Sequence, residues 1–171
     1  EPQFYRHSYG FRRGRSAHQA MRRLYEVLET RQKHAVVVGI DIEKFFTSID
    51  QDHLLKTLER KIADTFFLRH IRRLLRNSVL HTDGTLAQTL TGTPQGSPVS
   101  PILANICLNE VLDQWFRENY TGKGDMVRYA DDALFVFSDE AVARDFLGAL
   151  QARMNEAGLN LNLDKCAVVP F

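Results

Sequence analysis

Two adjacent carboxylates interrupt the apolar stretch Tyr129–Phe137, and they limit how this part of the chain can fold. Asp131 and Asp132 follow Tyr129 and Ala130 and precede the run 133–137. Adjacent side chains of a regular strand point to opposite faces, and two neighbouring acids that lose hydration repel each other. The sequence therefore predicts a tight hairpin tip at the acids, between strands over 126–129 and 133–137. A solvated turn without any chemistry is the alternative interpretation.

A third acid stands at the end of another apolar segment. Residues 35–42 form a β-branched run that is typical of a strand buried on both faces. Asp41 lies near its end, where a charge is costly unless it is paired or binds a metal ion. If this strand lies beside 133–137, Asp41 and Asp131 converge on one point. Two or three carboxylates there suit a hard divalent cation such as Mg²⁺.

The remaining segments predict a single α+β domain over residues 1–171. Ser16 and Gln19 fit a capping box, and Asp50 fits the N-cap of a second helix. The other expected elements are a helix through about Arg31, a helix over 67–75, a hairpin over 78–90 around Asp83-Gly84, a helix from Pro98 or Pro101 to about Glu118, a helix over 140–157, and strands over 159–163 and 166–169. This irregular order predicts an antiparallel sheet with helices packed on one face.

Composition and charge exclude several classes of protein. The 171 residues are 44% hydrophobic, but no apolar run approaches the ~18–20 residues of a membrane helix. The two cysteines lack the spacing of a zinc site or a disulfide framework. The net charge of +1 is segregated, because residues 1–34 and 53–81 are basic whereas 35–52 and 82–171 are acidic. Basic segments beside a carboxylate cluster suit a bound polyanion, and ordinary solvated helix faces are the alternative.

Five sequence blocks occur in an order that resembles the reverse transcriptases. Residues 41–46 (Asp-Ile-Glu-Lys-Phe-Phe) resemble the first catalytic motif of that family. Residues 93–105, which begin Thr-Pro-Gln-Gly-Ser-Pro, resemble the loop-plus-helix motif that follows it, and residues 129–132 (Tyr-Ala-Asp-Asp) resemble the catalytic hairpin. The flanking blocks 9–18 and 161–165 are similar to segments of bacterial group II intron reverse transcriptases (maturases).

The resemblance implies the palm domain of an RNA-directed DNA polymerase, with a sheet of the split βαβ (ferredoxin-like) type. It implies that dNTPs are added to the 3′-hydroxyl of a DNA primer on an RNA template. Two Mg²⁺ ions, for which Mn²⁺ can substitute, would serve this reaction. A group II intron-encoded protein of the bacterial cytoplasm, with intron RNA as a further partner and no membrane association, is the best match. CRISPR-associated and other bacterial reverse transcriptases are the alternative lineages.

The same resemblance assigns roles to the acidic site. Asp41 and Asp131 would bind the metal ions, Asp132 would assist, and the backbone carbonyl of Ile42 would be an additional ligand. Lys165 matches a lysine that lies near the pyrophosphate and can protonate it. An exposed lysine at a strand end is the alternative for Lys165.

The resemblance also implies the contacts of the nucleotide and the nucleic acid. Phe46 matches the aromatic side chain that excludes a ribose 2′-hydroxyl, and core packing is its alternative. The other implied nucleotide contacts are Lys44, Phe45 and Gln95. Gly96 would let the backbone approach the nucleic acid closely. Tyr129 would support the primer end, and Arg12, Arg13 and Arg15 would contact the template backbone or bases.

Two other functions are alternatives to an RNA-directed DNA polymerase. An RNA-directed RNA polymerase is disfavoured by Phe46, and an RNA-binding splicing cofactor with a vestigial polymerase site is disfavoured by the intact acids. Arg13 and Ser97 depart from the usual group II pattern, which leaves the lineage open. Because the chain begins without methionine, we expect it to be a piece of a longer protein that lacks part of the fingers and all of the thumb or maturase region. On its own it would then be weakly active or inactive.

Overall fold

A four-stranded antiparallel sheet forms the centre of the computed structural model, which describes residues 3–31, 34–76, 78–80, 86–88, 91–94 and 96–171. Its strands lie in the order β4-β5-β1-β6, so β1 and β5 are the two inner strands. The strands are β1 Val36–Ile40, β4 Gly124–Tyr129, β5 Asp132–Phe137 and β6 Ala167–Pro170. The mixed α+β prediction and the antiparallel sheet are confirmed.

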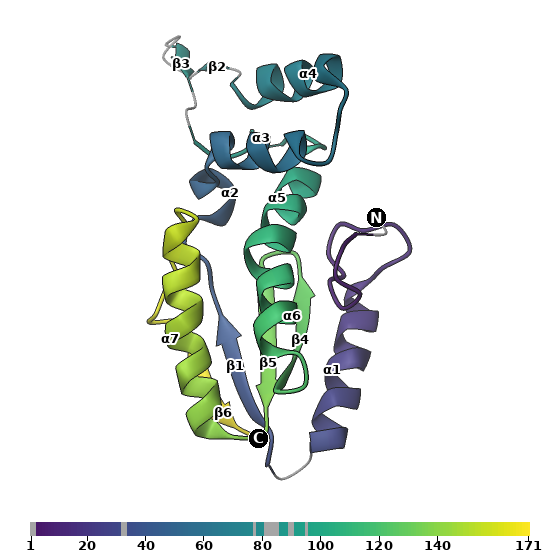
Figure 1. Ribbon diagram of the computed structural model, residues 1–171, viewed down its shortest axis with the longest axis vertical. Helices are drawn as coiled ribbons and strands as arrows, with labels where there is room; N and C mark the ends of the chain where they lie inside the picture. The colour runs from purple at the N-terminus through teal and green to yellow at the C-terminus, as the bar shows by residue number, and fades with distance from the viewer. Residues whose placement is uncertain (1–2, 32–33, 77, 81–85, 89–90, 95) are drawn as a thin grey trace.

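Helices pack against both faces of this sheet, so the prediction of helices on one face is wrong (Figure 1). One face packs against a long helical segment and α7. Val136 and Val127 point to the other face and pack against α1, because alternate strand residues face opposite sides. The helices are α1 Ala17–Arg31, α5 Ser100–Leu108, the π-helical stretch Asn109–Gln114, α6 Trp115–Tyr120 and α7 Glu140–Glu156.

A smaller helical layer lies beyond one end of the sheet, at the top of Figure 1. It contains α2 Phe45–Ser48, α3 Gln51–Glu59 and α4 Thr65–Leu75, followed by the pair β2 Ser78–Leu80 and β3 Leu86–Gln88. The antiparallel pairing of β2 with β3 confirms the predicted hairpin, while its Asp83-Gly84 tip lies outside the described residues. Among the described residues, no helix combines the length and the apolar character needed to cross a lipid bilayer.

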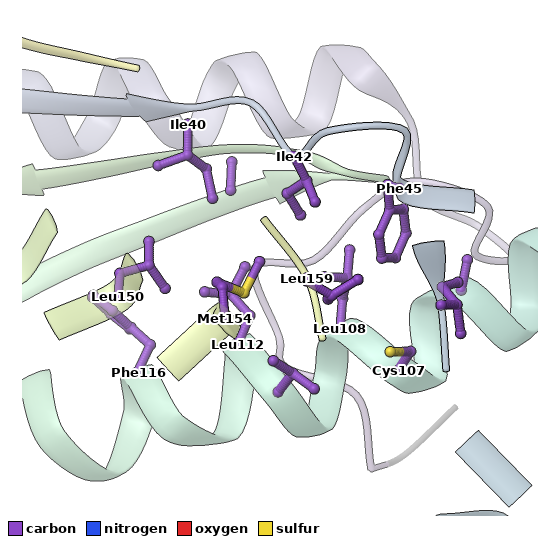
Figure 2. Packing of buried hydrophobic residues seen from close by; sticks show 14 of the residues in the cluster. Ile40, Ile42, Phe45, Cys107, Leu108, Leu112, Phe116, Leu150, Met154 and Leu159 are labelled. Atoms are coloured by element: carbon purple, nitrogen blue, oxygen red, sulfur yellow. The ribbon is translucent and has the colours of Figure 1, made fainter. Parts of the chain in front are cut away.

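The main hydrophobic core lies between the sheet and the helices on its larger covered face. Figure 2 shows Ile40 and Ile42 on the sheet side of this core and Leu108 and Leu112 on the helix side. Phe146 of α7 is fully buried at the aromatic end of the same core. Its ring centroid lies 4.5 Å from that of Phe135, 5.0 Å from Phe137, 4.9 Å from Tyr120 and 5.8 Å from Phe116.

Local signals in the sequence account for the starts of α1 and α3. Ser16 and Gln19 form the predicted capping box, in which each backbone N–H donates to the other side chain over 3.0 and 3.3 Å. The Asp50 side chain accepts from the His53 N–H at 2.8 Å, as predicted for the N-cap of α3. The predicted strand over 159–163 is wrong, since this segment contributes only an isolated bridge between Ile42 and Leu161.

The strand predicted to be buried on both faces is buried on one. Along β1 the residues alternate between buried and half-buried, because α1 covers only part of the second face. Near Asp41 this second face is left open, which gives the acid access to solvent.

We predict that Phe146→Ala lowers the free energy of unfolding by ~3–5 kcal/mol, because it removes a ring that fills the aromatic end of the core. Chemical denaturation followed by circular dichroism measures the change. Phe66→Ala is the matched control, since the Phe66 side chain is 67% exposed and its removal should change stability by no more than ~0.5 kcal/mol. Equal effects of the two substitutions would contradict this account of the core.

Candidate active site

The turn between β4 and β5 carries the paired acids. Tyr129 pairs with Asp132, so Ala130 and Asp131 form a two-residue hairpin loop, which confirms the predicted tip. Ala130 has a φ of 57°, whereas Asp131 has no positive φ, the pattern of a type II′ turn. Glycine usually occupies the first position of such a turn. An alanine there is held in a conformation that costs of order 1 kcal/mol.

The pairing of β1 with β5 brings the third acid to this turn. Ile40 pairs with Ala133, and the register places Asp41, the next residue of the chain, opposite Asp132. Residues opposite each other on antiparallel strands point to the same face of the sheet. That face is the one that carries α1, and it is open beside Asp41. The register thus brings Asp41 to Asp132, while the predicted convergence of Asp41 with Asp131 stays a prediction.

Electrostatics confirm that Asp132 is influenced by the other two acids. Partial desolvation raises the pKa of Asp132 above its ordinary value, and the negative charges of Asp131 and then Asp41 raise it further. Two carboxylates near a third disfavour its ionised form. The site therefore has an excess of negative charge that a cation would relieve.

Lys165 supplies one positive charge at the site. Its Nζ atom lies 3.6 Å from Oδ2 of Asp41, and the two side chains are 65% and 38% exposed. A pair exposed to this degree is screened by water and contributes little to stability. Lys165 is thus close enough to the acids to act in the same site, as its place in the sequence suggested.

A hollow of about 580 Å³ opens beside these residues, between α1 and the sheet. Asp41, Asp132 and Lys165 line one part of it, and Tyr129 lines it from β4 with 40% of its surface exposed. Ala17 and Met21 of α1 line the opposite side. Asp41 and Asp132 thus face a space that can admit a ligand.

The acidic site fits divalent cations by its chemistry. Its donors are carboxylate oxygens, which hard cations prefer, and Lys165 supplies a single positive charge against three acids. In the described part of the chain, no group of three His, Cys, Asp or Glu side chains is already arranged to hold a metal ion. The side chains of the acids would therefore have to adjust their rotamers around a bound ion.

A second hollow, of about 400 Å³, lies beside the other implied nucleotide contacts. Phe46 is half-buried and lines it together with Thr93, Pro94 and Gly96. The Phe46 carbonyl accepts a hydrogen bond from the Thr93 N–H at 2.8 Å, which joins the end of the first motif to the loop of the second. Gly96 has a φ of 79°, a conformation that favours glycine. Gln95 lies outside the described residues.

The other candidate residues of the first motif are placed differently. Phe45 and Ile42 are buried in the main core, so that only their backbone is left to contact a ligand. Lys44 is exposed and precedes α2 with a φ of 44°.

The three N-terminal arginines have different surroundings. Arg12 donates to the carbonyls of Tyr5 at 2.9 Å and Ser8 at 2.6 Å, so it fastens its own loop. The Arg15 guanidinium lies 5.4 Å from the Tyr9 ring centroid. Arg13 lines a third hollow, between the N-terminal loop, α3 and α5.

Comparison with known proteins assigns the chain to a family. Residues 2–170 match the family described as reverse transcriptase (RNA-dependent DNA polymerase). The chain belongs to the reverse transcriptase family. It is 42% identical over 127 residues to an uncharacterized 91 kDa protein encoded in a cob intron of Schizosaccharomyces pombe, a match that covers 73% of this chain and 15% of that protein. It is 36% identical over 111 residues to the group II intron-encoded protein LtrA of Lactococcus lactis, covering 65% of this chain and 18% of LtrA.

Solved structures of other reverse transcriptases share the fold. A telomerase from Candida albicans, in complex with a fragment of telomeric RNA, superposes on 99% of this chain with a TM-score of 0.76 and 19% identity. The match covers 32% of that telomerase chain. This reverse transcriptase chain thus spans only a small part of these relatives.

Three residues beneath the β4–β5 turn were not predicted from the sequence. Arg128 is fully buried, and its guanidinium donates to the carbonyl of Ala130 at 2.6 Å. Asp113 and Asn105, from the helices behind the sheet, accept hydrogen bonds from the same guanidinium. The basic residue Arg128 inside the expected strand 126–129 is the sequence signal from which this group could have been predicted.

We predict that Asp132→Asn stabilises the metal-free protein at neutral pH. The raised pKa of Asp132 means that its ionisation costs more in the folded than in the unfolded protein. This destabilising contribution is absent below the unfolded value of 3.8, grows as the pH rises through the folded pKa, and is complete above it. Thermal melts with a chelator should show a higher melting temperature for the variant at pH 7 than for the parent, and a smaller difference near pH 4.

Asp145→Asn, on the exposed surface of α7, controls for the loss of a surface charge. An Asp132→Asn gain that stays constant with pH, or that Asp145→Asn reproduces, would contradict the repulsion among the three acids.

Proposed function

We propose that this chain is the palm of an RNA-directed DNA polymerase, and that Asp41, Asp131 and Asp132 form its catalytic centre. The observation that carries the proposal is the β1–β5 register, which sets Asp41 opposite Asp132, the residue after Asp131, in a member of the reverse transcriptase family. The strand order β4-β5-β1-β6, with helices joining β1 to β4 and β5 to β6 on one side, supports the split βαβ form of a palm.

The reaction joins the primer to an incoming deoxynucleotide. The 3′-hydroxyl oxygen of the primer forms a bond to the α-phosphorus of a dNTP, the bond to the β-phosphate oxygen breaks, and pyrophosphate leaves. Two Mg²⁺ ions, or Mn²⁺ in their place, held by Asp41, Asp131, Asp132 and the Ile42 carbonyl, would supply charge neutralisation and lower the pKa of the hydroxyl.

The other residues bind and orient the substrates. Lys165 lies beside Asp41, where its ammonium can give a proton to the departing pyrophosphate. Tyr129 lines the same hollow and would support the primer end. Phe46 excludes a 2′-hydroxyl at the second hollow, and Lys44, Phe45 and Gln95 complete the nucleotide site. Gly96 and the arginines Arg12, Arg13 and Arg15 would contact the nucleic acid.

The longer protein that carries this chain would act on an RNA template with a DNA primer. The match to the intron-encoded proteins of Schizosaccharomyces pombe and Lactococcus lactis supports an intron-encoded protein, with intron RNA as its partner. Because the relatives come from both fungi and bacteria, the bacterial and cytoplasmic assignment stays a prediction, as do the palm boundaries at residues 1–171.

We predict that Asp131→Asn in the full-length protein reduces primer extension on an RNA template by at least ~10³-fold, because the variant loses a carboxylate at the developing charge. Asp145→Asn removes the same charge at a position away from the site, and this variant should extend primers at the parental rate. Extension of an end-labelled primer, resolved on a gel, measures both. Unchanged extension by Asp131→Asn would instead favour an RNA-binding splicing cofactor.

We predict that Phe46→Val lowers the preference for dNTPs over rNTPs by ~10–100-fold, since a smaller side chain leaves room for the 2′-hydroxyl. The readout is kcat/KM for a dNTP and its matching rNTP in single-nucleotide incorporation. Phe66→Val, on the exposed face of α4, is the control. A preference that Phe46→Val leaves unchanged would assign Phe46 to core packing alone.

A further inference from the structure

A buried ion pair lies directly behind the hairpin that carries the acids. Arg128 of β4 donates from Nε to Oδ1 of Asp113 at 2.7 Å and from Nη2 to Oδ2 at 2.6 Å. Both side chains have no exposed surface. Two fully desolvated charges are costly to keep, and a buried pair is by itself weak grounds for a stabilising role. The contacts of this ion pair with the β4–β5 turn point to a positioning role for it.

The third nitrogen of the Arg128 guanidinium reaches the turn itself. Nη1 donates to the Ala130 carbonyl at 2.6 Å and to Oδ1 of Asn105 at 2.9 Å. Ala130 is the turn residue with positive φ, and its carbonyl belongs to the peptide bond that leads into Asp131. Asp113 therefore fixes the guanidinium from behind, and the guanidinium fixes the peptide in front of the catalytic acid.

Asn105 connects this group to the N-terminal loop. Its Nδ2 donates to the Gly10 carbonyl at 2.8 Å. Its side-chain amide therefore donates one hydrogen bond and accepts another, from Arg128. The backbone of Gly10 lies against the turn so closely that a Cβ added there would come 2.2 Å from the Ala130 nitrogen. The neighbouring residues of the loop pair with β4, since Tyr9 N–H donates to the Arg128 carbonyl at 2.9 Å.

We propose that Gly10, Asn105, Asp113 and Arg128, here called the turn clamp, are positioning residues for Asp131 and Asp132. The proposal rests on the proposed function, because it concerns the same acids. The unfavourable φ of Ala130 acts to open this turn. A strained backbone conformation of this kind persists only where several surrounding contacts hold it in place. The turn clamp supplies a hydrogen bond from one side and a backbone contact from the other.

The turn clamp also ties the turn to two distant parts of the chain. Asn105 is on α5, which follows the loop that lines the Phe46 hollow, and Gly10 is in the N-terminal loop. Asp113 lies in the π-helical stretch that interrupts the helix between α5 and α6. Such interruptions are frequent at functional positions. The turn that carries the acids is thus tied to α5, the π-helical stretch and the N-terminal loop.

Substitution of Asn105 and Gly10 tests the proposal without leaving a buried charge unpaired, as removal of Arg128 or Asp113 would. Asn105→Ala removes the bonds to Gly10 and Arg128, and Gly10→Ala forces the loop away from Ala130. In the full-length protein, both are expected to speed hydrogen exchange of residues 129–132 by at least ~10-fold while peptides from α7 keep their protection. Both should lower kcat by ~10–100-fold with KM for dNTPs changed less than ~2-fold, since a misplaced catalytic group slows chemistry more than binding.

Asn119→Ala is the matched control, because Asn119 is exposed on α6 and bonds only to the carbonyl of Trp115 within the described residues. It should change neither readout. Exchange at 129–132 that stays at the parental rate in both variants, or that rises equally throughout the sheet and α7, would overturn the proposal. If the parent protein itself extends no primer, the proposed function fails, while the exchange comparison still decides whether the turn clamp holds the turn.

Discussion

The antiparallel pairing of β1 with β5 is the constraint on which the rest of the site depends. It places the residue after Ile40 opposite the residue before Ala133, and both are aspartates. A shift of one residue would turn Asp41 toward the apolar helix-facing core, where its charge could not be hydrated. The alternation of β1 fixes this register, because Val36, Val38 and Ile40 fill the core on the other face. Burial of apolar side chains thus determines where the acids meet.

Charge repulsion is the cost of this arrangement. Desolvation raises the pKa of Asp132 most, and the neighbouring charges of Asp131 and Asp41 raise it further. Lys165 offsets it only weakly, because the pair with Asp41 is open to solvent. A binding site for divalent cations needs this kind of surplus charge, and the fold keeps it at the rim of a hollow rather than within the core. The buried contacts behind Ala130 oppose the tendency of the turn to open.

Much of this site could be predicted from local sequence signals. The hairpin tip followed from two acids inside an apolar run, and the helix caps followed from Ser16, Gln19 and Asp50. The hairpin tip and the caps depend on interactions between residues a few positions apart, so a single sequence is enough to predict them. The placement of α1 on the second face could not be predicted in this way, because its apolar stripe fits either face of a sheet. The partners of Arg128 were missed for the same reason, since Asp113 is 15 residues away and its burial depends on how the helices pack.

The most direct test of the account is the location of a bound metal ion. In crystals of the protein grown with Mn²⁺, the anomalous signal that disappears below the manganese absorption edge locates the metal. The account predicts anomalous peaks whose nearest protein ligands are the carboxylates of Asp41 and Asp131, at the end of β1 and the tip of the β4–β5 hairpin. Saturating Mn²⁺ with no peak at these residues, or with Asp41 and Asp131 binding separate and distant ions, would contradict it.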